Sequence, residues 1–508
     1  MSAPLKQTGQ AALAGALLYA ASPGPQALPL LAWFALLPLF LAIDGVPVRR
    51  AATLGFVCGL VFFLPLLSFI VIVLSTYGGV AYPVAVAVMI LLAVYMALFP
   101  ALFAGILQML GGAGTSIWIA PGLWVGLDWL RGVLLTGFPW LDLGYTQYRQ
   151  ALLLQSADLG GHFAVTFLLV LASALLFRLL RRQSRRWHCN ELPAALLLLG
   201  ALVYGGFQLA AYRQSDAGTP SQRLVIVQGS IEQDEKWQPG QELATVLRYT
   251  GLSAGAQPGD LLVWPETALP FYPAGHPLFG EHILPLLRDR QTWLLTGTPY
   301  AEKVGGRVRY LNRAVLITPD GDIAGHYDKQ HLVPFGEYIP FRSVFSFLSP
   351  VVETMADFSP GLDTSLLSGE NAQIGALVCF ESIFPELARA QVTAGADLLV
   401  NITNDAWFGR SNAAYQHLAM AVLRAVENRR GLARAANTGI SGFISPAGEI
   451  SGETSMFVPA AVSGRLPLIE RLSVFSRFGH WFAPGCAALS LIALILGRGR
   501  RRPVRQGR

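Results

Sequence analysis

Charged residues are scarce in this 508-residue chain: they form 13% of the sequence, whereas soluble globular proteins average about 25%. Hydrophobic residues make up 53%, and the mean hydropathy is +0.47. This composition excludes an ordinary soluble protein and predicts that much of the chain lies in lipid. Lysine is especially rare, because the chain has 33 arginines but only Lys6, Lys236, Lys303 and Lys329.

Motifs for common cofactors are also missing. The sequence has no glycine-rich phosphate loop and no cysteine or histidine cluster with metal-ligand spacing, so it predicts no nucleotide, no other cofactor and no metal. A net charge of +6 is compatible with nucleic-acid binding, but the arginines lie beside apolar segments rather than among aromatics. We therefore interpret them as signals of membrane topology and expect no nucleic-acid partner.

Long apolar segments occur at eight places in the chain. The first resembles the apolar core of a signal peptide, but the second follows at once without a convincing cleavage site, which favours a retained membrane hairpin. The first is short and the fifth contains two ionisable residues. The candidate spans are residues 11–21, 27–43, 51–74, 80–110, 117–135, 163–180, 192–211 and 481–496.

Arginines follow the second, sixth and last of these spans, and all of them fall on one face of the membrane if the spans alternate. Both termini are then cytoplasmic, and the long hydrophilic segment lies on the other face. In a bacterium with an inner membrane that face is the periplasm. The expected domains are a seven-span bundle (residues 1–212), a periplasmic domain (213–475), and a last span with a basic tail (476–508).

Asp128 and Arg131 stand three residues apart in the fifth candidate span and share one face if it is helical. Ionisable groups at membrane depth usually face the bundle interior, so we expect a structural ion pair rather than a catalytic one. The sequence GFPWL at residues 137–141 follows. It predicts an interfacial loop with Trp140 at the level of the lipid headgroups.

The segment from about residue 222 to 464 changes character, because short apolar runs alternate with polar stretches. This pattern is typical of an α/β domain with layered sheets and helices. Several runs end in an ionisable residue, as expected when strand ends carry a site. The candidate strands are residues 223–228, 261–264, 293–296, 309–317, 374–379 and 397–402.

The strand predicted at residues 374–378 delivers one thiol, Cys379, to its end. By the topology above, Cys58 and Cys486 lie in spans and Cys189 lies in a cytoplasmic loop, so Cys379 has no disulfide partner in its domain. An unpaired thiol in an oxidising compartment is a liability unless it is buried or used. Cys379 is therefore either packed in the core or a nucleophile.

Two further ends carry chemistry: Glu266 follows residues 261–264, and Lys329 lies in the region HYDK at residues 326–329. A carboxylate can deprotonate a thiol, and an ammonium can stabilise an oxyanion, so together with Cys379 they suit acyl transfer. The alternatives are a helix-start acid for Glu266 and a solvated loop charge for Lys329, and taken singly each such residue is more often structural than catalytic. The scarcity of lysine weakens the second alternative, since generic positive charge in this chain is arginine.

Four motifs in order resemble the nitrilase superfamily and, within it, the apolipoprotein N-acyltransferases. They are WPETA at residues 264–268, YDKQHLVPFGE at 327–337, CFE at 379–381 and NITNDAWF at 401–408. The nitrilase part covers about residues 223–464, and the flanking spans extend the similarity to almost the whole chain. The resemblance implies an αββα sandwich joined to a helical membrane bundle of about eight transmembrane helices.

The resemblance also implies roles for individual residues. Glu266 would be the general base, Lys329 the oxyanion stabiliser and Cys379 the nucleophile. Glu337 and Glu381 would be supporting carboxylates, and Trp237 matches an aromatic that the family places near the site. Phe380 stands where relatives commonly have tyrosine, so a hydroxyl role is absent here, whereas its backbone N–H is still available for an oxyanion.

The implied reaction moves a fatty acyl chain from a membrane phospholipid, mainly phosphatidylethanolamine, to the α-amino group of the N-terminal diacylglyceryl-cysteine of an apolipoprotein. Residues 338–360, which are rich in phenylalanine, suit either a loop that dips into the interface or ordinary packing against the spans. Two other functions remain open from the residues alone. One is a membrane-anchored amide or nitrile hydrolase with the same triad, and the other is a non-enzymatic lipid or lipoprotein carrier in which Cys379 is a core residue.

Overall fold

The helical part and the sheet-containing part of the chain form separate units. The computed structural model describes residues 2–112, 117–181, 190–215, 218–238, 240–334, 336–338 and 358–499. One unit contains residues 1–68, 86–207 and 480–508, and the other contains residues 69–85 and 208–479. We call them the helical unit and the sandwich unit.

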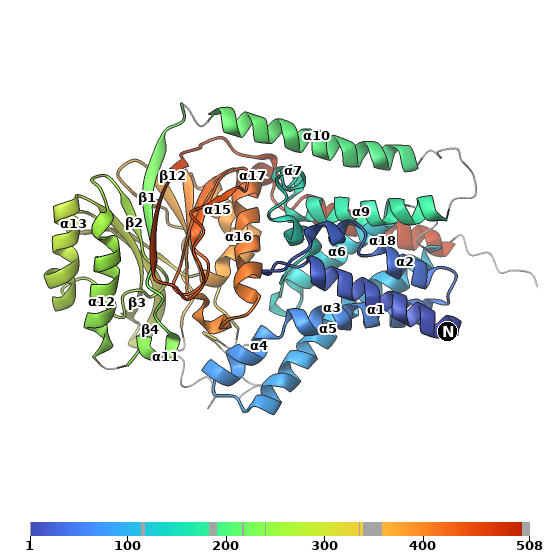
Figure 1. Cartoon of the computed structure of the whole chain (residues 1–508), viewed down its shortest axis with the longest axis horizontal. Helices are drawn as coiled ribbons and strands as arrows, with labels where there is room; N and C mark the ends of the chain where they lie inside the picture. Colours follow the sequence, from blue (N-terminus) through green and yellow to red (C-terminus); the bar gives the residue numbers. More distant parts are fainter. Residues whose placement is uncertain are drawn as a thin grey trace, which may run out of the picture. The chain divides into compact units, whose positions relative to one another are not determined.

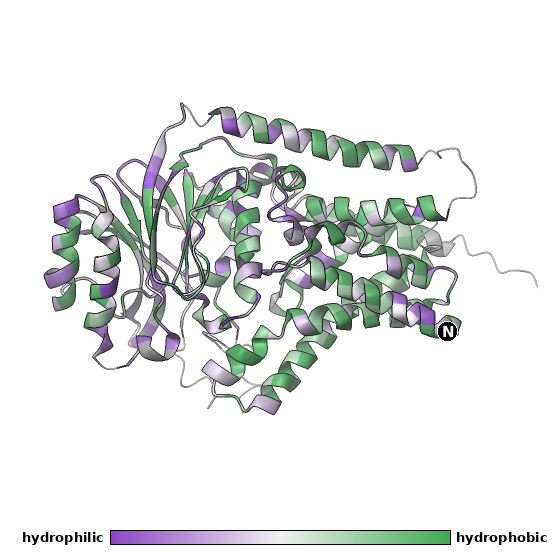
Figure 2. Ribbon diagram, in the orientation of Figure 1, coloured by the Kyte–Doolittle hydropathy of each residue, from purple (hydrophilic) through white to green (hydrophobic). Residues whose placement is uncertain are grey.

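Apolar helices make up the helical unit, as their colouring in Figure 2 shows. Its main helices are α1 (Ala3–Ala21), α2 (Leu37–Ile43), α3 (Val48–Leu66), most of α5 (Tyr82–Met109), α6 (Ile119–Val133), α9 (His162–Leu180), most of α10 (Glu191–Ser215) and α18 (Phe482–Gly499).

Four described helices are long and apolar enough to cross a membrane: Val48–Leu66, Tyr82–Met109, His162–Leu180 and Glu191–Arg213. The eight expected spans therefore become four by length and composition. The second expected span is broken into a 3-10 turn and the short α2. The fifth forms a helix of only 15 residues. The last forms a helix of 18 residues, whose apolar part is Phe482–Leu496. The first, α1, begins with a polar turn that contains Lys6 and Gln7.

The C-terminal helix α18 is an integral part of the helical unit. Ala483 and Cys486 on α18 share a buried cluster with Val125 of α6 and Phe163 of α9. The contact with α6 is close, because a side chain at Gly126 would place its Cβ 2.9 Å from the Cα of Ala487. Because glycine has no Cβ, the backbone of α18 at Ala487 can pack this closely against α6 at Gly126.

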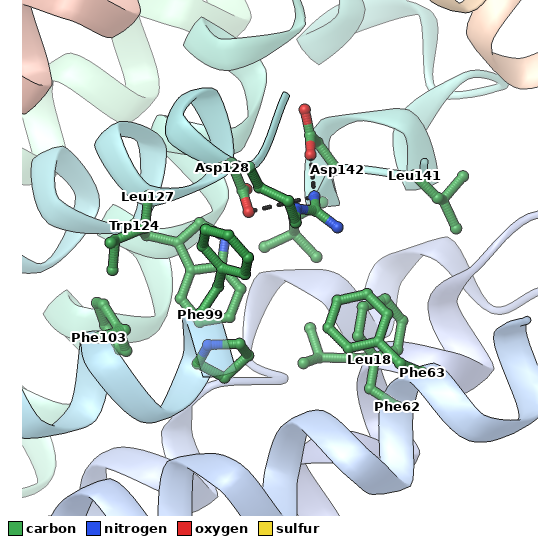
Figure 3. A pocket seen from close by; sticks show the side chains of 13 residues that line it. Leu18, Phe62, Phe63, Phe99, Phe103, Trp124, Leu127, Asp128, Leu141 and Asp142 are labelled. Carbon is green, nitrogen blue, oxygen red and sulfur yellow. Dashed lines mark hydrogen bonds and ion pairs between the residues drawn. The ribbon is translucent and has the colours of Figure 1, made fainter. Parts of the chain in front are cut away.

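Asp128 and Arg131 form the expected ion pair, with the guanidinium 3.3 Å from the carboxylate, and both are buried. Arg131 also pairs with Asp142. Figure 3 shows Asp128 and Asp142 on one side of an apolar cavity, across from Phe62 and Phe63. A buried charge needs such partners, so the cluster has the structural role that the sequence predicts.

Trp140 corrects one expectation. It is 1% exposed, its ring stacks on Phe138 with centroids 5.8 Å apart, and its carbonyl accepts a hydrogen bond from Arg131. Trp140 is therefore part of the interior of the helical unit rather than an exposed headgroup anchor. Its carbonyl supplies one of the acceptors that the buried guanidinium requires.

Two six-stranded sheets form the centre of the sandwich unit. The first sheet has the order β12-β1-β2-β3-β4-β5 and the second β11-β10-β9-β8-β7-β6. The strands are β1 (Ser221–Gln228), β2 (Leu261–Val263), β3 (Trp293–Val304), β4 (Arg307–Ile317), β5 (Ile323–Asp328), β6 (Leu367–Ser368), β7 (Gln373–Val378), β8 (Leu398–Thr403), β9 (Gly431–Ala436), β10 (Gly442–Ile444), β11 (Ile450–Ser451) and β12 (Ala460–Pro467).

Alternation along the strands builds two cores. On β1, Leu224 and Ile226 join the core between the sheets, which also contains Ile374 of β7, whereas Val225 and Val227 face the helices. Helices α12 (Gln241–Leu252) and α13 (Leu284–Arg290) cover the first sheet, and α15 (Pro385–Thr393) and α16 (Ala413–Asn428) cover the second (Figure 1). The αββα sandwich expected from the sequence is confirmed.

Each sheet contains a parallel part, and β4 and β5 extend the first sheet by antiparallel pairing. β2 pairs in parallel with β1 and β3, and β7 pairs in parallel with β8. All six predicted strands are present. Among the strands that the sequence analysis missed, β9 with its sequence GLARAA is rich in alanine and glycine and lacks the β-branched residues that mark a strand, and β6 and β11 are only two residues long.

Candidate active site

The three predicted catalytic residues each follow a strand of the sandwich unit. Glu266 lies three residues beyond β2, Lys329 comes directly after β5, and Cys379 comes directly after β7. They are 6%, 1% and 8% exposed. Three ionisable groups this deeply buried must interact with one another or with other polar groups, because an isolated buried charge is strongly unfavourable.

Lys329 lies between two carboxylates. Its Nζ is 3.5 Å from Glu266 Oε1 and 2.9 Å from a carboxylate oxygen of Glu337. Burial by itself lowers the pKa of Lys329, but Glu337 and Glu266 outweigh this effect and hold the pKa above its ordinary value. The site therefore contains a permanently charged ammonium, fixed in position by Glu266 and Glu337.

The Glu266 carboxylate is held by two donors. Asn312 Nδ2 donates to Oε1 at 2.7 Å, and the backbone N–H of Asn404 donates to Oε2 at 2.9 Å. Asn312 also donates to Glu337 at 3.2 Å, so it joins both carboxylates that contact Lys329. The sequence analysis missed Asn312, which is an amide within the buried half of β4, whose full sequence is RVRYLNRAVLI.

Cys379 stands at a sharp turn between β7 and a 3-10 helix, with a φ of +52° in the left-handed region. Few residues other than glycine adopt this conformation, and in folded proteins such strain gathers at functional sites. Burial raises the pKa of the Cys379 thiol, and nearby Glu266 raises it further, against the opposing effect of Lys329. The resting thiol is therefore protonated and needs a base.

A buried network holds the backbone of the nucleophile. The Cys379 carbonyl accepts from Asn401 Nδ2 at 3.5 Å and lies 3.1 Å from His417 Nε2. His417 Nδ1 is 2.9 Å from Asp405, which also accepts from Arg434 at 2.8 Å. Asn401 and Asp405 belong to the NITNDAWF motif, but the sequence analysis singled out neither His417 nor Arg434.

Comparisons with known proteins agree with this geometry. The N-terminal domain of apolipoprotein N-acyltransferases matches residues 14–175, and the carbon-nitrogen hydrolase family matches residues 223–460. An apolipoprotein N-acyltransferase of Geobacter metallireducens is 44% identical, covering 98% of this chain and 96% of the relative. Another from Azotobacter vinelandii is 36% identical, covering 97% and 95%. The chain belongs to the apolipoprotein N-acyltransferase family.

Nit3 of Saccharomyces cerevisiae, a nitrilase superfamily member, aligns with a TM-score of 0.38 at 18% identity, covering 49% of this chain and 90% of Nit3. An amidase of Nesterenkonia aligns with a TM-score of 0.35 at 23% identity, covering 49% and 91%. As a member of the apolipoprotein N-acyltransferase family, the chain is an acyltransferase and a membrane protein, with an N-terminal helical domain and a nitrilase-type sandwich.

Glu381 faces the backbone rather than the thiol in this N-acyltransferase. Its Oε1 accepts from Tyr327 Oη at 2.9 Å and from the N–H of Gln330 at 2.7 Å, and its Oε2 accepts from the N–H of Val378 at 2.7 Å. Burial raises the pKa of Glu381 to about 7. This carboxyl therefore ties the segment after Lys329 to the strand that ends at Cys379.

The two predicted aromatics lie in different surroundings. Phe380 is 7% exposed and packs edge-on against Phe384, with ring centroids 5.2 Å apart. Trp237 follows α11 (Gln233–Lys236) and is 52% exposed. Its ring contacts the site indirectly, because it lies 5.9 Å from the Nζ of Lys236.

We expect Arg434→Met to destabilise the sandwich unit by about 3–5 kcal/mol, since it removes one partner of a buried ion pair. Burial alone raises the pKa of Asp405, but Arg434 and His417 lower it from 3.8 to about 2. The pKa of Asp405 is lower in the folded state than in the unfolded state. Its ion pair therefore contributes fully to the stability of the fold above about pH 4, and this contribution is lost as the pH falls through about 2. Thermal unfolding of the detergent-solubilised variant at pH 7 measures the effect.

The double variant Arg434→Met with Asp405→Asn is the matched comparison, since it leaves no unpaired carboxylate and should recover part of the loss. Equal unfolding temperatures for the wild type and Arg434→Met would contradict the role of this ion pair.

Proposed function

We propose that the chain transfers a fatty acyl chain from a membrane phospholipid to the N-terminal amine of an apolipoprotein, by two half-reactions that share Cys379. The observation that carries the proposal is that one carboxylate, one ammonium and one thiol are buried just beyond the ends of three strands, β2, β5 and β7, with the ammonium 3.5 Å from the Glu266 carboxylate. Each supplies a different part of acyl transfer: Glu266 moves protons, Lys329 provides positive charge and Cys379 attacks.

In the first half-reaction Glu266 takes the Cys379 proton as the sulfur bonds to the carbonyl carbon of the donor ester. The tetrahedral intermediate collapses, the bond to the alcohol oxygen breaks, and Glu266 returns the proton to that oxygen. A thioester on Cys379 and a lysophospholipid result. The protonated resting thiol makes the base necessary, since sulfur would otherwise have to attack as a poorly nucleophilic thiol.

In the second half-reaction the amine nitrogen attacks the thioester carbonyl. Glu266 removes a proton from the nitrogen, the carbon–sulfur bond breaks, and the same proton goes to the departing sulfur. An amide and the original thiol result. One carboxylate serves both steps because its proton is gained and lost once in each.

Lys329 is the proposed oxyanion stabiliser in both steps, together with the backbone N–H of Phe380. Glu266 and Glu337 hold the Lys329 ammonium at 3.5 and 2.9 Å, so little reorganisation is needed when charge develops on the carbonyl oxygen. The second carboxylate, Glu337, is the proposed positioning partner of this ammonium.

Phosphatidylethanolamine is the proposed donor and the α-amino group of an N-terminal diacylglyceryl-cysteine the proposed acceptor. Both molecules are membrane-bound, which accounts for a nitrilase-type sandwich joined to apolar helices. The expected covering loop at residues 338–360 lies largely outside the described residues, since 339–357 are not described. Amide hydrolysis with water as acceptor is the second candidate, and the carbon-nitrogen hydrolase match over residues 223–460 favours it.

Supplied with phospholipid alone, the enzyme should release one equivalent of lysophospholipid per active site and then slow, because the N-terminal amine of the apolipoprotein acceptor is absent. Mass analysis should find one acyl group on Cys379. With both substrates, double-reciprocal plots at several fixed apolipoprotein levels should be parallel. Continued lysophospholipid release without acceptor would favour the hydrolase, and intersecting lines would indicate transfer with both substrates bound together.

We further propose that the chain lies in a bacterial inner membrane with both termini cytoplasmic and the catalytic domain periplasmic, over the domain boundaries 1–212, 213–475 and 476–508. The four long apolar helices alone would leave the sandwich unit on the same face as both termini. The arginine asymmetry requires an odd number of crossings before this unit, so shorter apolar helices must also cross.

A cysteine introduced at the exposed Ala301 should react with a membrane-impermeant thiol reagent in cells whose outer membrane alone is permeabilised. The background is Cys379→Ala, which removes the native thiol of the domain. Arg49→Cys, after the second predicted span, is the matched control and should stay unlabelled until the inner membrane is ruptured. The reverse pattern would place the catalytic domain in the cytoplasm.

A further inference from the structure

A second lysine is buried beside the general base. Lys236, the last residue of α11, is 3% exposed. Its Nζ donates to the backbone carbonyl of Glu266 at 3.1 Å and to Oγ1 of Thr267. Lysine is almost never this deeply buried without a defined set of partners. Here the partners are Glu266 and Thr267, the two residues of the turn that carries the base.

The turn that Lys236 binds has an unusual backbone. Thr267 has a φ of +47°, in the left-handed region that β-branched residues rarely adopt. Gly297 of β3 makes room for it, because a Cβ at Gly297 would lie 2.3 Å from the Thr267 nitrogen and 2.7 Å from the Glu266 Cα. A conformation of this kind persists only where its surroundings enforce it.

The turn is held from two sides. On one side β3 binds it, since the N–H of Gly297 donates to the Pro265 carbonyl at 3.1 Å. On the other side Lys236 donates to the Glu266 carbonyl and to the Thr267 hydroxyl. Removing Lys236 would leave these buried acceptors without that donor, so the turn would be expected to shift.

The charges of the site also favour an ammonium at this place. Two carboxylates, Glu266 and Glu337, face the single ammonium of Lys329, which leaves one negative charge in excess. A protonated Lys236 offsets it. Burial lowers the pKa of Lys236 to about 8, while Glu266 and an ionised Cys379 act in the opposite direction. At pH 7 Lys236 therefore carries its proton in most molecules.

We propose that Lys236 is a positioning residue for the general base, acting through the Glu266 carbonyl and the Thr267 hydroxyl to aim the Glu266 carboxylate at the thiol. The inference rests on the proposed role of Glu266. Proton transfer depends steeply on geometry, and a displacement of about 1 Å can cost about 10²-fold in rate. Lys236 also contacts Trp237, which connects this exposed aromatic to the base turn.

The test measures the rate of thioester formation on Cys379 in the full-length enzyme, with phosphatidylethanolamine in detergent micelles and no acceptor. Lys236→Met should lower the maximal acylation rate about 10²-fold and leave the phospholipid concentration at half-maximal rate unchanged. Thr267→Val keeps the shape of the side chain but removes the hydroxyl, and should lower the same rate by a smaller factor. Lys303→Met removes an exposed lysine of β3 and should have the wild-type rate.

The double variant Lys236→Met with Thr267→Val shows whether the two residues act together. If Lys236 works through the turn, the losses are not additive and the double variant is about as slow as Lys236→Met. Multiplied losses, a wild-type rate for Lys236→Met, or a change confined to the half-maximal phospholipid concentration would overturn the proposal. Thermal unfolding shows whether Lys236→Met folds. If it does not, Lys236→Arg takes its place in the same double-variant comparison with Thr267→Val, because a guanidinium retains donors for the Glu266 carbonyl and the Thr267 hydroxyl.

Glu266→Gln, measured in parallel, separates the proposed role of Glu266 as the general base from the proposed role of Lys236 as its positioning residue. If Glu266→Gln loses acylation while Lys236→Met does not, only the role of Lys236 fails. If Glu266→Gln acylates at the wild-type rate, the base assignment itself fails and the proposal for Lys236 fails with it.

Discussion

Cys379→Ala is expected to form no acyl-enzyme and to lose acyl transfer by at least about 10⁴-fold, since removal of a covalent nucleophile leaves only binding and oxyanion stabilisation. Glu266→Gln should come close to this loss. The amide keeps the shape of the carboxylate, but it cannot accept the thiol proton, and the thiol is protonated at rest because burial and Glu266 raise its pKa. Mass analysis of Cys379 after incubation with phospholipid measures acylation directly.

The matched control is Glu370→Gln, an exposed carboxylate in the same unit, which should acylate at the wild-type rate. Thermal unfolding of each variant tests whether the fold is retained. Residual acylation in Cys379→Ala at more than a few per cent of the wild-type rate would mean that another residue carries the acyl group, and the two-step mechanism would have to be abandoned.

Lys329→Arg is expected to lower the acylation rate by about 10²- to 10³-fold, which is the usual effect of removing one oxyanion donor. The substitution keeps the positive charge but replaces a compact ammonium with a planar guanidinium. Lys329 is 1% exposed and its compact ammonium fits between Glu266 and Glu337. A planar guanidinium is wider and presents its donors in a fixed fork, so it cannot take the same position without displacing a carboxylate.

The comparison variant is Lys303→Arg, at an exposed position where the same substitution should change nothing. Single-turnover measurement separates the acylation step from later product release. A near-normal acylation rate for Lys329→Arg would show that the site needs charge alone, and the role of Lys329 as a close oxyanion partner would be wrong.

Two strand ends of the site were predictable because their signals are local. A short apolar run before Glu266 and another before Cys379 are visible in the sequence, and the structure places both residues directly after or near the end of a strand. The strand that precedes Lys329, β5, was not among the predicted strands, because its sequence IAGHYD mixes polar and apolar residues. That the three lie together came from the family resemblance rather than from spacing. The first of them is 113 residues from the last, so no local pattern joins them.

The supporting residues were harder to find because their partners are distant in sequence. Asn312 contacts Glu266 across 46 residues, and His417 contacts the Cys379 carbonyl across 38. Both sit on elements whose other residues are mostly apolar, where a buried amide or imidazole looks like a packing residue. Arg434 is similar: its charge is satisfied by Asp405, 29 residues away, and nothing around it marks a buried ion pair.

The membrane segments show a different limit. A hydropathy window averages over about 20 residues, so it registers the apolar content of residues 27–43 but not the break near Phe34 that separates a 3-10 turn from α2. It likewise cannot show that Trp140 is buried by Phe138 rather than exposed to headgroups. Both errors arise because side-chain burial within a bundle depends on neighbouring helices.

The position of α18 has a consequence for how the chain is made. This helix packs on α6 and α9, yet the residues of the sandwich unit are translated between them and it. During synthesis the first helices must therefore wait in the membrane with one flank uncovered, while about 270 residues are translated and moved to their destination. The flank that Gly126 presents to Ala487 is covered only once α18 has been made. Packing of the helical unit is therefore completed only in chains whose sandwich unit has already been translated.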